Sequence, residues 1–263
     1  MNILQEIAER TKERIEEKKK ITSSENLIEK ARLLYENNDF VFEAALRSQD
    51  IAFICEIKKA SPSKGVISKD FPYLEIAKEY EASGAEAISV LTEPYYFKGD
   101  DRYLREIANT VSIPLLRKDF IVDSYMIYEA KVLGASAILL ICSLLDHDTL
   151  IEYINIAHNL GLSALIETHD ESEMETALSA GARIIGVNNR NLKTFEVDIS
   201  LSARLRKMVP YDVLFVSESG INSSDDIMKL REIGADAALI GESIMRSSDK
   251  KAAIARLRGN DRG

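Results

Sequence analysis

The sequence is poor in cysteine, and it lacks tryptophan and long apolar runs. Its two cysteines, Cys55 and Cys142, lie inside apolar segments and not at the spacings of a disulfide framework, which indicates free thiols in a reducing compartment. The longest apolar stretch, residues 137–145, is far shorter than the roughly 20 residues of a membrane span, and no secretory leader opens the sequence. We therefore expect a cytoplasmic protein with no membrane partner.

Basic residues and cofactor motifs are also scarce. The 34 lysines and arginines are outnumbered by 43 aspartates and glutamates, for a formal charge of −9. This balance argues against a nucleic-acid partner, because nucleic acids are bound by net basic surfaces. No P-loop, dinucleotide-binding glycine motif or nucleophile elbow occurs. The three histidines, His147, His158 and His169, are not spaced as metal ligands. We expect neither a metal nor an organic cofactor.

An internal repeat organises most of the chain. A segment that begins with Gly-Ala recurs four times, at Gly84, Gly134, Gly181 and Gly234. Each copy follows an amphipathic stretch (73–83, 124–133, 171–180 and 224–233) and precedes an apolar run, so the glycine suits the end of a helix before a buried strand. Four further apolar runs, at 51–57, 113–116, 162–166 and 213–216, bring the expected strands to eight, and 242–257 predicts a closing helix.

This alternation predicts the fold. Strands that are apolar on both faces, alternating with helices, are typical of a parallel sheet covered by helices. Eight such units between residues 51 and 257 predict an α/β protein with a (β/α)₈ TIM barrel. An open doubly wound sheet is the alternative, but it would not need a four-fold repeat of strand–helix pairs.

The first fifty residues differ from the rest. They are rich in glutamate and lysine, with leucine and isoleucine at near-helical spacing. We expect residues 1–50 to form an N-terminal helical extension that caps one end of a barrel formed by 51–263, with its charged face in solvent. No linker rich in serine, glycine or proline separates the two parts, so 1–263 is expected to be a single domain.

Charged and amide side chains follow the apolar runs at five of the eight strand ends. They include Glu56, Lys58, Lys118, Glu167, Asn188, Arg190 and Glu218. In a TIM barrel the C-terminal strand ends meet at one mouth, where active sites lie. Any one of these side chains could be a solvated rim charge, but the set favours a site for acid–base chemistry. Burial and neighbouring charges can lower the pKa of a lysine towards the working range and turn a carboxylate into a base.

A phosphate site is expected beside the last two strands. Gly220 and Gly241 each follow a predicted strand and leave backbone N–H groups open to an anion, and Ser61 and Lys64 lie in a loop that would face them. Plain turn chemistry is the alternative for each glycine. Together they favour a small phosphorylated substrate.

Four motifs, each at its own strand end, resemble the indole-3-glycerol phosphate synthase family. They are EIKKASPSKG at 56–65, LLRKDF at 115–120, GVNNRNL at 186–192 and VSESGI at 216–221. The resemblance covers almost the whole chain. It implies a TIM-barrel carboxy-lyase of tryptophan biosynthesis that converts 1-(2-carboxyphenylamino)-1-deoxyribulose 5-phosphate to indole-3-glycerol phosphate, carbon dioxide and water. It also implies ring closure, decarboxylation and dehydration without metal or organic cofactor.

The resemblance implies roles for individual residues. The catalytic set is Lys118, Glu167, Lys58, Glu56, Asn188 and Glu218. Lys118 matches the general acid that protonates the ketone oxygen, and Glu167 the carboxylate that removes a proton in the dehydration. Lys58, paired with Glu56, is expected near the substrate's carboxylate and hydroxyl and shares the acid role. Asn188 orients the substrate, and Glu218 holds the lysines.

The remaining matches concern substrate binding. Ser61, Ser219, Gly220 and Gly241 match contacts to phosphate and hydroxyl groups, Arg190 a contact to the carboxylate, and Phe97 and Phe120 aromatic walls for the anthranilate ring. Glu242 stands where some relatives have serine, so only its backbone is expected to contribute. Ser124 stands where many relatives have proline, with no evident chemical consequence.

Three other functions fit parts of the pattern. A phosphosugar isomerase would need a cysteine and an aspartate as its acid–base pair, and Cys55 should point away from Glu56. A Schiff-base aldolase could use Lys118 or Lys58. A subunit that binds a phosphorylated metabolite without turning it over would need no catalytic lysine. We expect a monomer more than a homodimer.

Overall fold

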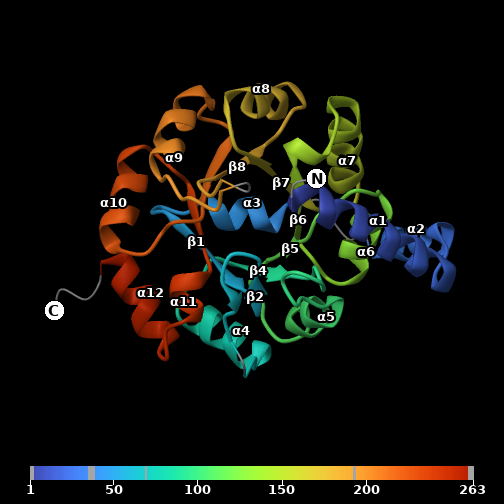
Figure 1. The fold of residues 1–263 in the computed structure, drawn as a ribbon, viewed down its shortest axis with the longest axis horizontal. Coiled ribbons are helices and arrows are strands. Elements are labelled where there is room, and N and C mark those ends of the chain that lie inside the picture. Colours follow the sequence, from blue (N-terminus) through green and yellow to red (C-terminus); the bar gives the residue numbers. More distant parts are fainter. Residues whose placement is uncertain (1–2, 35–38, 69, 192–193, 260–263) are drawn as a thin grey trace.

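The computed structural model describes residues 3–34, 39–68, 70–191 and 194–259, and Leu192 of the third motif lies outside them. Eight parallel strands form a closed barrel in the order β1-β10-β9-β8-β7-β6-β5-β4, with β1 pairing to both β4 and β10 (Figure 1). The strands are β1 Ala52–Ile57, β4 Ala87–Leu91, β5 Leu115–Lys118, β6 Ala137–Ile141, β7 Ser163–Thr168, β8 Ile184–Asn188, β9 Leu214–Glu218 and β10 Ala237–Ile240. The predicted TIM barrel is confirmed, and the open sheet is not.

Helices surround the barrel (Figure 1). They are α4 Tyr73–Ala82, α5 Asp101–Ala108, α6 Tyr125–Val132, α7 His147–Asn159, α8 Glu171–Ser179, α9 Ser200–Leu205, α10 Ser224–Glu232, α11 Glu242–Met245 and α12 Lys250–Arg258, with short 3₁₀ helices η1 Cys142–Leu144 and η2 Arg206–Met208. The four repeat glycines follow helices with φ between +72° and +88°, as expected for a helix end. None of the helices in the described ranges is both long and apolar enough to span a membrane.

Two boundaries differ from the prediction. The single helix expected over 242–257 is broken into α11 and α12, because the Asp249 side chain accepts a hydrogen bond from the Ala252 N–H and starts a new helix. The strand expected over 113–116 instead covers Leu115–Lys118. Pro114 has no N–H to donate to a sheet, so the strand begins after it, and Lys118 becomes its last residue.

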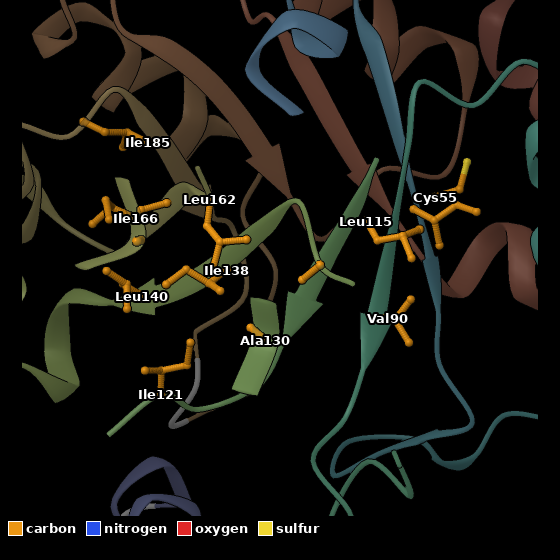
Figure 2. Close-up of a cluster of buried hydrophobic side chains, with 14 of the residues drawn as sticks. Cys55, Val90, Leu115, Ile121, Ala130, Ile138, Leu140, Leu162, Ile166 and Ile185 are labelled. Atoms are coloured by element: carbon orange, nitrogen blue, oxygen red, sulfur yellow. The ribbon is translucent and has the colours of Figure 1, made fainter. Parts of the chain in front are cut away.

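Strand side chains alternate between two buried layers. One layer fills the barrel interior and includes Ile54, Leu116, Leu165 and Val216. The other packs between the strands and the surrounding helices; Figure 2 shows members of this layer, among them Cys55, Ile138, Ile166 and Ile185. Burial on both faces explains why the strands are almost continuously apolar.

The N-terminal extension contacts both ends of the barrel. It comprises α1 Ile3–Ile21, α2 Ser24–Leu33 and α3 Val41–Leu46. Helix α3 closes the end where the strands begin, since Oε1 of Glu43 accepts hydrogen bonds from Arg183 Nε at 3.1 Å and Ser163 Oγ at 3.3 Å. Helix α1 lies at the opposite end, where Arg14 binds Asp119 just after β5. The expectation of a cap on one end alone is wrong.

Candidate active site

A cavity of about 640 Å³ opens at the C-terminal ends of the strands. All thirteen residues singled out as catalytic or substrate-binding line it: Lys118, Glu167, Lys58, Glu56, Asn188, Glu218, Ser61, Phe97, Phe120, Arg190, Ser219, Gly220 and Gly241. Ile3, Leu4 and Ile7 of α1 add an apolar part of the wall that we did not predict. The barrel topology therefore brings residues from positions 3 to 241 to one mouth.

Lys118 lies between two buried carboxylates at this mouth. Its Nζ is 3.1 Å from Oε2 of Glu167 on β7 and forms an ion pair with Oε2 of Glu218 on β9. Burial works against the ammonium charge, but the two carboxylates hold the pKa of Lys118 above its ordinary value. Our expectation that burial and neighbours would lower this pKa is wrong, because two close carboxylates outweigh desolvation. Lys118 is therefore protonated at neutral pH and has a proton to donate.

The two carboxylates beside Lys118 have different electrostatic environments. Burial, reinforced by repulsion from Glu167 and Glu56 and opposed by Lys118, raises the pKa of Glu218 to about 7. Burial also disfavours charge on Glu167, but Lys118 and His169 hold the pKa of Glu167 below its ordinary value. A pair of carboxylates with separated pKa values is typical of acid–base sites.

A second ion pair lies on β1 and the loop that follows it. Lys58 Nζ pairs with Oε1 of Glu56, and both side chains are largely buried. A Cβ on Gly241, directly after the neighbouring strand β10, would overlap the Glu56 carboxylate. The absence of a side chain at Gly241 therefore leaves space for the Glu56–Lys58 pair. We did not predict this role from the sequence.

The ends of β8 and β9 form a hydrogen-bonded corner. Asn188 Oδ1 accepts from the Arg190 N–H at 3.1 Å and from Ser219 Oγ at 2.9 Å, and Arg190 Nη1 donates to the Phe195 carbonyl at 3.2 Å. Ser219 has φ +67° and Gly220 φ +82°. A serine in the left-handed region costs on the order of 1 kcal/mol and is a frequent feature of functional sites.

The cavity is lined by both apolar and polar residues. The rings of Phe97 and Phe120 lie 5.9 Å apart between centroids, near the apolar residues of α1. The wall also contains the serines and glycines after β1, β9 and β10, together with Lys64, whose Nζ is 3.8 Å from Oε1 of Glu242. The Glu242 carboxylate also accepts from Arg246 Nε at 3.1 Å. Such a cavity suits a ligand with an aromatic part and an anionic part.

Sequence reasoning missed His169. Its Nε2 lies 3.4 Å from Oε1 of Glu167, and its Nδ1 lies 3.0 Å from Oε2 of Glu173 on α8. The two-residue spacing that paired Glu56 with Lys58 also separates Glu167 from His169 and could have indicated it.

Two other side-chain arrangements bear on the predictions. Cys55 belongs to the layer between strands and helices (Figure 2), away from Glu56, as expected. Among the residues that the structure describes, no group of three or more His, Cys, Asp and Glu side chains is arranged to hold a metal ion.

Comparisons with known proteins identify relatives of the chain. Residues 4–257 match the family model described as indole-3-glycerol phosphate synthase. The protein of that name from Ruminiclostridium cellulolyticum is 59% identical over 258 residues, covering 98% of this chain and 99% of its own. The one from Endomicrobium trichonymphae is 55% identical, covering 94% and 96%.

Solved structures support the fold alone. The 3-hexulose-6-phosphate synthase from Salmonella typhimurium aligns with a TM-score of 0.66 at 14% identity, covering 80% of this chain and 97% of its own. Thiamine phosphate pyrophosphorylase from Pyrococcus furiosus aligns with a TM-score of 0.60 at 18% identity, covering 81% and 96%.

Proposed function

We infer the roles of the cavity residues from one premise: the chain belongs to the indole-3-glycerol phosphate synthase family. It is a carboxy-lyase of tryptophan biosynthesis that converts 1-(2-carboxyphenylamino)-1-deoxyribulose 5-phosphate to indole-3-glycerol phosphate, carbon dioxide and water. Because the chain belongs to this family, we set aside the alternatives of an isomerase, an aldolase and a binding subunit.

Lys118 is the general acid of the ring closure. In this step the ring carbon that bears the carboxylate bonds to the ketone carbon, and the ketone oxygen takes a proton. The observation that carries the assignment is the position of Lys118 Nζ between Glu167 and Glu218 in the cavity, because this pairing keeps the ammonium protonated in a buried place. Glu218, with a pKa of about 7, holds the ammonium and can return a proton to it.

Glu167 is the base of the dehydration. After carbon dioxide leaves, the new hydroxyl departs as water and a proton leaves the neighbouring carbon. Glu167 is ionised and lies beside Lys118, so the same pair can remove one proton and supply the other. Lys58, held by Glu56, shares the acid role and binds the substrate's carboxylate and hydroxyl.

The remaining cavity residues hold the substrate. Phe97 and Phe120 pack against the anthranilate ring, while Arg190 binds its carboxylate and Asn188 orients it. The phosphate lies on Ser61, Ser219, Gly220 and Gly241, which contribute backbone N–H groups and hydroxyls to the cavity wall. Holding both ends brings the two reacting carbons together, which is a major source of rate enhancement.

The molecule acts as a cytoplasmic monomer whose residues 1–263 form one domain. The complete cavity within a single chain supports the monomer. The free, buried thiols of Cys55 and Cys142 support a reducing compartment. Packing of α1 and α3 against opposite ends of the barrel supports one domain.

The test is to mix purified protein with the substrate in the presence of a metal chelator. Product formation is monitored by the fluorescence of the indole. We expect Lys118→Met and Glu167→Gln each to lower kcat by about 10²- to 10⁴-fold, with a smaller change in KM. Lys78→Met, an exposed change on α4, is the matched control and should keep wild-type kcat. Binding without product in the wild type would contradict the function, and wild-type turnover by Lys118→Met would contradict the assigned acid.

A further inference from the structure

We propose that His169, as an imidazolium clamped by Glu173, is a positioning residue that holds the Glu167 carboxylate ionised and oriented for proton removal. The proposal rests on the role of Glu167 in the proposed function. It concerns a side chain that the sequence motifs did not indicate and that the mechanism above does not use.

The geometry fixes the imidazole ring from one side. Oε2 of Glu173 lies 3.0 Å from His169 Nδ1 and also accepts the His169 backbone N–H at 2.8 Å. Glu173 is itself anchored in the first turn of α8, where its N–H donates to Asp170 Oδ1 at 2.9 Å. The ring is 17% exposed, and its other nitrogen, Nε2, lies 3.4 Å from Glu167 Oε1 as an ion-pair contact without the geometry of a hydrogen bond.

Glu167 therefore faces a different cation at each oxygen. Oε1 faces His169, and Oε2 faces Lys118 at 3.1 Å. Two contacts at opposite oxygens restrict rotation of the carboxylate, which a single ion pair would allow. A base held in one orientation loses less entropy on reaching the transition state.

The pairing of carboxylates with lysines in the cavity also favours a cation at His169. Glu56 pairs with Lys58, whereas Glu167 and Glu218 share Lys118, so an imidazolium at His169 gives Glu167 a cation that it does not share with Glu218. Burial opposes that charge, but the adjacent carboxylates of Glu167 and Glu173 raise the pKa of His169 to about 10.

The charged groups that act most strongly on the imidazole are carboxylates. The titratable side chains of the packed elements that face this region are Glu167 of β7, Asp170 and Glu173 at the start of α8, and Cys142 of η1. Burial raises the pKa of the Cys142 thiol to about 12, so it stays neutral. The ring thus lies between the carboxylates of Glu167 and Glu173, which favour its protonated form.

The reaction sequence gives this second cation a purpose. When Lys118 donates its proton in the ring closure, it becomes neutral, and Glu167 no longer has a positive charge beside Oε2. A buried carboxylate with no cation would take up a proton and could no longer act as a base. His169 retains its charge through that step, so Glu167 is still ionised when the dehydration requires it.

Three variants separate positioning from simple packing. His169→Ala should lower kcat by about 10- to 100-fold while KM changes by less than about two-fold. His169→Gln keeps a donor without the charge and should recover part of kcat. Glu173→Gln should fall between wild type and His169→Ala. His147→Ala, an exposed change on α7, is the control and should have wild-type kcat.

Nuclear magnetic resonance of the imidazole groups tests the charge independently of activity. The His169 signal, assigned by its absence from His169→Gln, should keep its imidazolium shift at pH 8. The His158 imidazole, whose pKa burial lowers, should be neutral there. Because the folded-state pKa of His169 lies above the ordinary value, its contribution to stability is complete below pH about 6.5 and is lost as pH rises towards 10. The stability difference between wild type and His169→Gln should shrink over that range.

Each result supports or overturns the proposal. A neutral His169 at pH 7, or wild-type kcat in His169→Ala with only a lower melting temperature, overturns it. If His169→Ala does not fold, the proposal is still tested by the His169 imidazole resonance of the wild type and by the kcat of His169→Gln. Failure of the proposed function is a separate outcome, because wild-type protein would then yield no indole product whatever the charge of His169.

Discussion

Replacing Gly186 with alanine should disturb the active site without replacing a catalytic side chain. Gly186 lies in β8, opposite Glu167 of β7 and Val216 of β9. A Cβ at this position would overlap Oε1 of Glu218 and lie 3.2 Å from Leu165 Cδ1. Its backbone is not in the left-handed region, so alanine meets no conformational strain there. The change acts only through the displaced carboxylate.

The size of the effect follows from this overlap. Leu165 and the surrounding strands are buried in the barrel interior, so the Glu218 carboxylate must move by about 1 Å, and the ion-paired Lys118 must move with it. Overpacking of this kind costs about 1–3 kcal/mol of stability. A displacement of about 1 Å at a catalytic group costs about 100-fold in rate, equivalent to about 2.7 kcal/mol in the barrier. We expect kcat to fall by this factor and KM to change little.

The matched control is Gly181→Ala. Gly181 has φ +81°, and a Cβ there has no atom within 4 Å, so the change strains the backbone by about 1–2 kcal/mol without entering the cavity. Initial rates by indole fluorescence and unfolding by circular dichroism should show both variants destabilised and only Gly186→Ala slowed. If Gly186→Ala keeps kcat within about two-fold of wild type, the position of Glu218 does not govern turnover and the reasoning fails.

Two further experiments test other buried groups. Arg14→Ala removes a guanidinium whose Nη2 donates to both oxygens of buried Asp119 at 3.0 Å; it should lower the free energy of unfolding by about 3 kcal/mol, measured in urea, whereas exposed Lys12→Ala should not. The thiols of Cys55 and Cys142, whose pKa values burial raises, should react with a chromogenic disulfide only after denaturation. Rapid colour from native protein would contradict their burial.

The fold could be predicted because its signals are local. The left-handed glycines at the helix ends, such as Gly84 and Gly134, recur with the strand that follows each of them. The site followed from the fold, since a parallel barrel brings every C-terminal strand end to one mouth. Position along the strand was thus enough to indicate Lys118, Glu167 and Glu218.

The protonation of the site could not be predicted in the same way. Lys118 is 49 residues from Glu167 and 100 residues from Glu218 in sequence. Desolvation lowers the pKa of a lysine and carboxylates raise it, so the sign of the shift depends on distances that sequence does not contain. His169 was missed for a related reason, because its importance comes from Glu173 on the next helix as much as from Glu167.

The N-terminal extension illustrates how charged residues at a surface can hold a buried site. Lys19 of α1 binds Asp123 at 2.7 Å, and Lys18 binds Glu129 at 2.7 Å, so part of the face expected in solvent is paired with the barrel. Arg14 binds Asp119, the residue directly after Lys118. Asp119 is buried and its charge is compensated mainly by Arg14 and Arg117. Helix α1 therefore fixes the end of β5 from outside, and the backbone that carries Lys118 has its geometry set partly by a segment that precedes the barrel.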